Sequence, residues 1–227
     1  MDVTSIQQDV VARNLANANQ PGYRRQVLSF ETFLAKNALV GAKAELHQDF
    51  TPGDPVHTGA ELDVALVSDG FFTVQDPSGL LYTRNGTFHR NAQGRLVTFD
   101  GRAVLGMPGP RGEDVAITIP RTAKTISILD NGTVVADKVA VGRLRLARFS
   151  DNNRLTRVGT TFFRPPDGLR PELGVGEVRQ GYRERSNGEM VSELMHMVFG
   201  FRHYEASERA LRSLSDAVQQ QTRPQPG

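Results

Sequence analysis

Cysteine is absent from the 227 residues, which excludes disulfides, a thiol nucleophile and a Cys-ligated zinc site. Long apolar runs are missing too, since no stretch approaches the ~20 residues of a transmembrane helix, and we expect no membrane insertion. The first residues, MDVTSIQQDVVARN, lack the cationic start and apolar core of a cleavable signal peptide. The sequence therefore predicts a chain that is cytoplasmic or is exported without signal cleavage.

Lysine is scarce, with 4 residues against 23 arginines, although the net charge is only +2. Arginine is the residue that best recognises phosphate, so this bias raises the question of a nucleic-acid partner. The arginines are spread along the chain among 25 acidic residues, and the basic doublet Arg24-Arg25 is too short for a binding stripe. We predict no nucleic-acid partner and attribute the bias to codon usage.

Catalytic and metal-binding patterns are missing as well. The chain has no nucleophile elbow, P-loop or dinucleotide fingerprint. His196 and His203 are seven residues apart, whereas chelation on one helix face needs three or four. Asp69 and Asp100 stand in turn positions, where aspartate is chosen for backbone geometry. We predict no catalytic residue, no metal, no cofactor and no enzymatic activity.

The centre of the chain has the pattern of an antiparallel β domain. Between residues 62 and 182, short apolar runs alternate with Asp-Gly and Asn-Gly pairs, which are strong hairpin signals. We expect hairpin turns at 69–70, 85–86, 100–101 and 131–132. The aromatic residues of these runs are predicted to be core, and they are Phe71, Phe72, Tyr82, Phe88 and Phe99.

Both ends of the chain have helical spacing instead. Residues 3–18 predict a helix that stops before Pro21-Gly22. A capping box formed by Ser186 and Glu189 predicts a second helix from 187 to about 220, roughly 50 Å long. Its apolar stripe is narrow, which favours a helix–helix seam over an ordinary cap on the β domain. The predicted assembly seam consists of Val3, Ile6, Val10, Leu15, Met190, Leu194, Met197, Phe201, Tyr204, Leu211 and Val218.

These patterns together predict the fold class and the domain organisation. The fold is expected to be mainly β, with antiparallel short strands and hairpins, and with N- and C-terminal α-helices forming a coiled-coil-like arm. The expected parts are an N-terminal helical arm (1–22), an extended connector (23–60), a β-rich domain (61–185), a C-terminal helical arm (186–222) and a tail (223–227).

Three segments, in this order, resemble the bacterial flagellar rod and hook family of axial proteins. The stretch 14–23, NLANANQPGY, is similar to the family's N-terminal signature, with Gln20 in place of the usual Thr. The stretch 62–74 resembles its central L-D-x-A…G-F-F-x-V block, which continues through YTRNGTF at 82–88. The end resembles the S-N-V…Y/F-E pattern, with Gly188 replacing Val. The residues that carry the resemblance are Asn14, Leu15, Asn17, Pro21, Gly22, Tyr23, Leu62, Asp63, Gly70, Phe71, Phe72, Tyr82, Thr83, Arg84, Gly86, Phe88, Ser186, Asn187, Arg202 and Glu205.

The resemblance implies a structural subunit of the flagellar basal-body rod. Such subunits polymerise through terminal helices into a hollow, torque-transmitting shaft. The implied partners are further copies of the chain, other rod and hook axial proteins, and the flagellar type III export apparatus. The implied location is the periplasmic basal body, reached without a cleaved signal peptide. Distal and proximal rod subtypes stay open, with the distal one favoured.

Two other classes of function are weighed against this one. A secreted cell-wall-binding β-module, oligomerised by its helical tail, would share the β domain. A hydrolase would need a convergent acidic or nucleophilic cluster, and the sequence offers none.

Overall fold

The structure is a computed structural model that describes residues 3–35, 38–108, 113–174 and 176–222. Side chains are described within these ranges except at 3–4, 30, 31–35, 38–44, 203–204 and 216–222. The chain divides into two units, which are described separately. Unit 1 comprises Met1–Ala16, Gln26–His47 and Glu189–Gly227, and unit 2 comprises Asn17–Arg25 and Gln48–Gly188.

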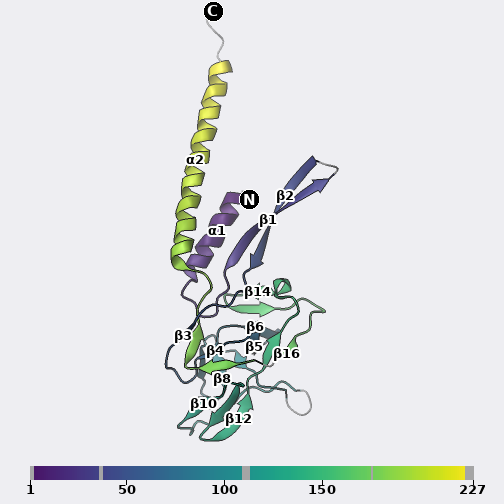
Figure 1. Ribbon diagram of the computed structural model, residues 1–227, viewed down its shortest axis with the longest axis vertical. Coiled ribbons are helices and arrows are strands. Elements are labelled where there is room, and N and C mark those ends of the chain that lie inside the picture. The colour runs from purple at the N-terminus through teal and green to yellow at the C-terminus, as the bar shows by residue number, and fades with distance from the viewer. Residues whose placement is uncertain (1–2, 36–37, 109–112, 175, 223–227) are drawn as a thin grey trace, which may run out of the picture. The chain divides into compact units, whose positions relative to one another are not determined.

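Unit 1 contains the two helices and one hairpin. Helix α1 (Val3–Ala16) packs against helix α2 (Met190–Thr222), and α1 also contacts strand β1 (Figure 1). Strands β1 (Gln26–Ala35) and β2 (Ala38–Gln48) pair as a two-stranded sheet, with Gln48 assigned to unit 2. The second helix begins at Met190, so the expected start at 187 is wrong. Ser186 Oγ instead accepts a bond from Gly188 N at 3.0 Å, which closes a turn before the helix.

Unit 2 is built from short strands, as the turn-rich sequence predicts. The strands are β3 (Pro55–His57), β4 (Val64–Leu66), β5 (Phe71–Asp76), β6 (Gly79–Thr83), β7 (Phe88–Arg90), β8 (Leu96–Thr98), β9 (Ala103–Val104), β10 (Ile126–Ile128), β11 (Thr133–Ala136), β12 (Val139–Arg143), β13 (Leu146–Arg148), β14 (Thr156–Val158), β15 (Phe162–Arg164), β16 (Glu172–Gly174), β17 (Val178–Gln180) and β18 (Tyr182–Glu184). A 3₁₀ turn, η1 (Asn152–Arg154), precedes β14.

The main sheet of unit 2 has nine strands, seven of them in the order β14-β15-β6-β5-β9-β8-β7. Strand β13 pairs with both β5 and β16, and all of these pairings are antiparallel. A three-stranded sheet, β10-β11-β12, and the pairs β17-β4 and β18-β3 complete the unit. The mainly β fold with a helix near each end is therefore confirmed, whereas coiled-coil packing of the arms stays a prediction.

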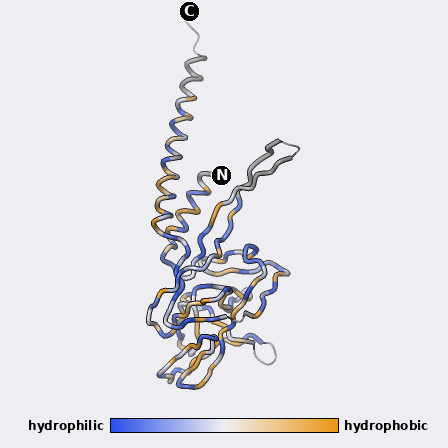
Figure 2. Tube along the Cα trace, viewed as in Figure 1, coloured by the Kyte–Doolittle hydropathy of each residue, from blue (hydrophilic) through white to orange (hydrophobic). Residues whose placement is uncertain are grey.

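The core lies on both faces of the main sheet. Successive residues of a strand face opposite sides, so Phe72 enters one hydrophobic cluster and Phe71 the other. Leu81 and Tyr82 of β6 divide in the same way. Apolar residues consequently recur along the strands of unit 2, and those of α2 gather in its first half (Figure 2). Both faces of β5 are covered along Phe71–Val74, so its first four residues are all buried, the polar Thr73 included.

The turn pairs have two different roles. Asp100-Gly101 and Asn131-Gly132 join paired strands, β8 to β9 and β10 to β11, as expected. Asp69-Gly70 and Asn85-Gly86 do not, because β4 pairs with β17 and β6 does not pair with β7. The hairpin expectation is wrong at these two places. The first turn leads from β4, which pairs with β17, into the main sheet, and the second leads from β6 to β7, which β5, β9 and β8 separate in that sheet.

The core prediction holds for four of the five aromatic residues. Phe71, Phe72, Tyr82 and Phe88 are buried, whereas Phe99 is 89% exposed. Strand β8 ends at Thr98, so Phe99 belongs to the following turn and points away from the core.

The segment 23–60, expected to be an extended connector, contains the β1–β2 hairpin of unit 1 and strand β3 of unit 2. The proposed domain boundaries otherwise stay a proposal. None of the described helices combines the length and apolarity needed to span a bilayer.

Candidate functional site

Three segments of unit 2, each continuous in sequence with unit 1, bind one another. These junction segments are residues 17–25, 48–54 and 184–188. Gly22 N donates to Glu184 O, Asp49 N to Arg25 O, and Arg185 N to Asp54 O, each at 2.9 Å. The points where the chain leaves unit 2 are thus fixed to each other by backbone hydrogen bonds.

The Glu184 carboxylate is the centre of the junction. It accepts hydrogen bonds from Arg24 Nη2, from Arg84 Nε at 2.8 Å and from Gly53 N at 2.9 Å. The three charged side chains are almost entirely buried. Burial lowers the pKa of Arg24, and the neighbouring Glu184 carboxylate opposes this effect. One buried carboxylate therefore compensates two guanidinium groups.

Arg84 connects this charge cluster to the sheet. Its Nη1 donates to the carbonyl oxygens of Ser68 and Gly70, both at 2.8 Å, and its Nη2 donates to Leu66 O at 3.1 Å. These carbonyl dipoles offset the part of the guanidinium charge that Glu184 does not neutralise. The junction is thereby anchored to the loop that joins β4 to β5.

Asn187 ties the last junction segment to the other two. Its Oδ1 accepts from Arg25 N at 2.8 Å, and its Nδ2 donates to Asp49 O at 2.7 Å and to Thr51 O at 3.0 Å. The backbone N of Asn187 also donates to Tyr23 O at 3.3 Å. The Asn187 side chain accepts one backbone hydrogen bond and donates two. Ionised aspartate has no donor and leucine has no polar group, so neither could replace it.

Arg157 reaches the junction from the hairpin of β14 and β15. Its guanidinium lies 4.5 Å from the ring centroid of Tyr23 and donates to Arg24 O. Its Nε donates to Gln48 Oε1 at 2.9 Å. The cation therefore covers the buried Tyr23 ring and binds two junction segments at once.

Gly22 lets the first junction segment approach the sheet closely. Its φ is +65°, and a Cβ at this position would lie 2.3 Å from Asn85 N. Any side chain would both strain the backbone and push the segment off Asn85.

Unit 1 has a polar anchor of its own. Asn14 of α1 donates to Gln26 O and accepts from Gln26 N, both at 2.8 Å, as a paired strand would. Its Nδ2 also lies 3.3 Å from Glu193 Oε1 of α2, and both side chains are buried. Asn14 thus fixes α1 to β1 and to α2 through one amide group.

The predicted seam residues fall into two groups. Val10 is buried, and Ile6, Leu15 and Met197 are half-buried, in keeping with the packing of α1 on α2. The other described members are exposed, and they are Met190, Leu194, Phe201 and Leu211. The side chains of Val3, Tyr204 and Val218 lie outside the described residues.

The exposed apolar residues of α2 form a surface of their own within its first three turns. Val191 and Phe199, which the seam prediction omitted, are 63% and 58% exposed. We call this surface the α2 apolar face, and it consists of Met190, Val191, Leu194, Met195, Val198, Phe199 and Phe201. Contiguous exposed apolar residues of this kind mark an interaction site.

The residues that carry the family resemblance meet in the junction to a large extent. Gly22, Tyr23, Arg84, Gly86, Ser186 and Asn187 lie in it or beside it, although they come from three separate parts of the chain. Asn17 and Pro21 belong to its first segment, Leu15 to α1, and Thr83 donates to Thr161 O at 2.8 Å. Leu62, Asp63, Gly70, Phe71, Phe72, Tyr82 and Phe88 belong to the sheet region. Arg202 and Glu205 do not belong to the junction. Both are exposed on α2, where Glu205 pairs with Arg209.

Sequence reasoning missed the roles of Arg24, Glu184 and Arg157 in the junction. The sequence presents Arg24 only as part of the basic doublet Arg24-Arg25, and it indicates no role for Glu184. In β18 Arg183 is exposed and Glu184 is buried, a difference between two charged neighbours that the sequence Tyr-Arg-Glu does not indicate. No sequence pattern indicates that Glu184 pairs with residues 160 and 100 positions away.

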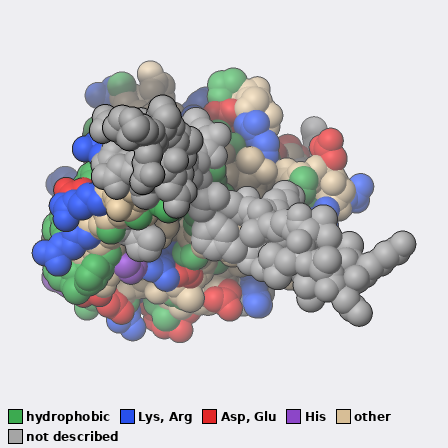
Figure 3. Space-filling model, turned by 90° about the horizontal axis from the view of Figure 1, so that it is seen from above, with side chains coloured by type: hydrophobic (Ala, Val, Ile, Leu, Met, Phe, Trp, Pro, Cys, Tyr) green, Lys and Arg blue, Asp and Glu red, His purple; other side chains and the backbone are tan. Residues whose placement is uncertain are grey.

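The described residues include no group of three or more His, Asp or Glu side chains arranged to hold a metal ion. On the face seen in Figure 3, arginines and lysines are interspersed with acidic side chains and do not form a stripe. The features that stand out are instead a buried polar junction and an exposed apolar helix face.

Comparison with known proteins indicates one family. Residues 65–136 match the family model of the flagellar hook protein FlgE/F/G D1 domain, and residues 1–24 match that of the flagella basal body rod protein. The chain is 30% identical to the flagellar basal-body rod protein FlgG of Agrobacterium fabrum, over 95% of this chain and 92% of the relative. It is 31% identical to FlgF of Caulobacter vibrioides, over 92% of this chain and 87% of the relative. FlgF of Salmonella typhimurium is 32% identical over 94% of this chain and 90% of its own length.

These relatives are structural proteins and not enzymes, and none of them supports a cell-wall-binding module. Their matches extend over 92–95% of the chain. The chain therefore belongs to the family of flagellar basal-body rod proteins, the structural subunits of the rod.

Proposed function

We propose that this chain polymerises through α1 and α2 into a hollow shaft that transmits torque. The observation that supports the proposal most directly is the α2 apolar face, which α1 leaves uncovered. These seven side chains are 40–63% exposed, so burial of the apolar area they still expose to water would favour association. Further copies of the chain and other rod and hook proteins would cover the face.

The junction has a defined part in this proposal. A shaft transmits torque only if its helices and its β unit turn together, and the chain leaves unit 2 through segments that Glu184 and Asn187 bind tightly. Buried charged hydrogen bonds resist displacement because breaking them leaves unpaired charge behind. We infer that the junction resists twisting of the connections.

The place of work and the route to it are part of the same proposal. We assign the chain to the basal body, in the periplasmic space, after passage through the flagellar export apparatus with its N-terminus uncleaved. The names of the relatives support the basal-body location. N-terminal sequencing of the assembled protein tests the absence of cleavage, since removal of a leader would contradict it.

The assembly step is tested by burying a charge in the proposed interface. Leu194→Asp places a carboxylate on the α2 apolar face, and we expect it to abolish polymerisation of the purified protein and swimming of a deletion strain that carries it. Val139→Asp is the control, because Val139 is an apolar residue of β12 in unit 2 that is more exposed than Leu194, at 64% against 44%. Normal polymers and normal swimming with Leu194→Asp would refute the role of this face.

A further inference from the structure

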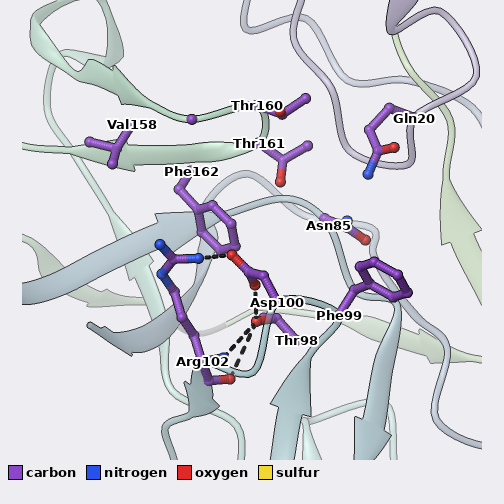
Figure 4. A pocket seen from close by; sticks show the side chains of 11 residues that line it. Gln20, Asn85, Thr98, Phe99, Asp100, Arg102, Val158, Thr160, Thr161 and Phe162 are labelled. Carbon is purple, nitrogen blue, oxygen red and sulfur yellow. Dashed lines mark hydrogen bonds and ion pairs between the residues drawn. The ribbon is translucent and has the colours of Figure 1, made fainter. Parts of the chain in front are cut away.

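Thr161 is a buried residue whose hydroxyl has no partner among the described residues. Only 3% of the residue is exposed, and its carbonyl oxygen accepts a hydrogen bond from Thr83 Oγ1 at 2.8 Å. Its Oγ1 makes no hydrogen bond within the described ranges and points into a hollow of about 270 Å³ that lies entirely within unit 2 (Figure 4). A buried hydroxyl costs free energy unless another group binds it. The hydroxyl therefore marks this hollow as a candidate binding site.

Two side-chain amides line the same hollow. Asn85 Oδ1 accepts a hydrogen bond from Thr87 N at 3.0 Å, so its Nδ2 is turned away from Thr87, and Nδ2 has no partner in the described part of the chain. The Gln20 side chain makes no hydrogen bond to the described residues either. In Figure 4 the side chains of Gln20, Asn85 and Thr161 converge on one side of the hollow. Together they offer hydrogen-bond donors and acceptors but no charge.

The polar groups are held in place by a bond between two walls of the hollow. Thr83 Oγ1 donates to Thr161 O at 2.8 Å and accepts from Asn85 N at 3.0 Å, so one buried hydroxyl links the two residues. Groups that are arranged before a ligand binds lose little conformational freedom on binding. The convergence of these side chains thus favours recognition of a ligand of fixed shape.

The Phe99 ring forms the rim of the hollow. It is 89% exposed, and the turn that carries it is closed by a hydrogen bond from Gly101 N to Thr98 O at 2.8 Å. The face of an aromatic ring carries partial negative charge, which attracts the weakly positive C–H groups of a saturated ring. Phe99 therefore supplies a flat apolar surface beside Asn85.

The charges of the hollow are already paired. Arg102 forms ion pairs with Asp100 and, at 2.8 Å, with Asp76, and its guanidinium lies 4.6 Å from the centroid of the Phe162 ring. An ionic ligand would find no free counter-charge among the lining residues. The hollow therefore suits an uncharged ligand that combines hydrogen-bonding groups with an apolar face.

We infer that this hollow binds one ring of a neutral saccharide. A pyranose ring carries hydroxyls that donate and accept along its edge, and it carries C–H groups on its face. The edge matches Thr161, Asn85 and Gln20, and the face matches the exposed Phe99 ring. A cavity of about 150 Å³ already holds the six-membered ring of benzene, so the larger hollow has room for one sugar ring. The site lies in unit 2 and does not depend on the proposed polymerisation.

An uncharged peptide is the other class of ligand that carries both donors and acceptors. An extended peptide presents them alternately on its two sides over several residues, and it is bound mainly by rows of backbone groups. Three side chains that converge on one point instead fit neighbouring hydroxyls of one ring. The geometry therefore favours the saccharide, and a peptide serves as the comparison ligand.

Nuclear magnetic resonance on the isotopically labelled full chain tests the inference. The side-chain amide signals of Asn85 and Gln20 are followed while maltotriose, cellotriose or tri-N-acetylchitotriose is added, and a capped, uncharged tripeptide is added in a parallel titration. We expect at least one trisaccharide to shift both signals saturably, with a Kd of about 1 mM or below. No saturable shift with any of the three, shifts confined to other surfaces, or tighter binding of the tripeptide would overturn the inference.

Phe99→Ser removes the stacking surface and should weaken saccharide binding about tenfold. Val139→Ser is the control, because Val139 is an exposed apolar residue of β12 that does not line the hollow. The same titration measures both variants. A Kd that Phe99→Ser leaves unchanged would contradict the role of the ring and overturn the site.

Thr161→Val replaces the hydroxyl by a methyl group of similar size and should weaken binding about fivefold or more. The midpoint of thermal unfolding should stay the same or rise, since the lost hydroxyl has no partner among the described residues. Thr133→Val, on β11 and outside the hollow, is the control and should leave the Kd unchanged. An unchanged Kd for Thr161→Val, with or without a lower unfolding midpoint, would show that the hydroxyl has only a structural role and would overturn the inference.

Discussion

Glu184 is a single carboxylate that pairs with two buried guanidinium groups, those of Arg24 and Arg84. Arg24 Nε and Nη1 have no hydrogen-bond partner within the described part of the chain, so the Glu184 carboxylate, bound by Nη2, is the main compensation of the Arg24 charge. Arg84 is better supplied, since it also donates to backbone carbonyls. Removing the Glu184 charge therefore exposes an imbalance that the surrounding groups cannot correct.

Glu184→Gln should lower the free energy of unfolding by about 3 kcal/mol, because it leaves two buried guanidinium groups without a carboxylate. Urea unfolding followed by circular dichroism measures the change. Glu205→Gln is the control, since its pair with Arg209 is exposed on α2 and such pairs contribute about 0.2–1 kcal/mol. Equal effects of the two substitutions would contradict the role assigned to Glu184.

Asp76 provides a prediction about acid stability. Hydrogen bonds from Ser78 and Arg102 lower its pKa to about 2, below the value of about 3.9 for an unfolded chain. A depressed folded-state pKa stabilises the fold above the unfolded value, and this stabilisation is lost as the pH falls from about 4 through about 2. Thermal unfolding measured across this window should therefore depend less steeply on pH in Asp76→Asn. An identical slope in both proteins would exclude Asp76 as a contributor.

At the scale of elements, glycine is needed for different reasons in the Asp100-Gly101 and Asn85-Gly86 turns. Gly101 belongs to a hairpin in which backbone geometry is decisive, with φ at +85°. Gly86 has no such φ, but a Cβ there would lie 1.7 Å from Val64 O. Strand β4 and the chain before β7 approach so closely that only hydrogen fits between them.

Gly86→Ala should therefore be severely destabilising, by roughly 3 kcal/mol or more, because backbone atoms cannot move aside as a flexible side chain can. Gly142→Ala is the matched control, since its Cβ would meet Ile117 at an ordinary distance of 3.5 Å. Chemical unfolding of both variants gives the comparison. A mild effect at Gly86 would mean that β4 and β7 shift apart easily.

The apolar spacing predicts where the helices lie in the sequence, but not which of their residues are covered. The apolar spacing predicts α1 and α2 and places Val10 in a contact, but α2 exposes most of its predicted seam. Within the described residues, the helix that packs on α2 is α1, and the shorter helix covers one side of it. Helical periodicity indicates that a face is apolar, but it does not indicate what covers that face.

For the whole molecule, the division into two units predicts separable stability. A chain ending at Gly188 loses α2 but keeps every residue of unit 2, including the junction and both core clusters. We expect this variant to retain slow amide exchange in β4, β5 and β6 and to lose polymerisation. Hydrogen exchange and sedimentation measure the two properties. Loss of protection throughout the sheet would show that unit 2 depends on the helices.

Three ordered motifs, an all-β centre and two helical ends are local features, and the sequence by itself determined them because turn chemistry and apolar period act over a few residues. The meeting of Arg24, Arg84 and Glu184 was decided only by the tertiary structure, since their pairing spans 160 and 100 residues. The same holds for Phe99, whose alternation matches a buried strand position. Strand β8 ends one residue earlier, because the turn to β9 begins there, and the ring is left in solvent.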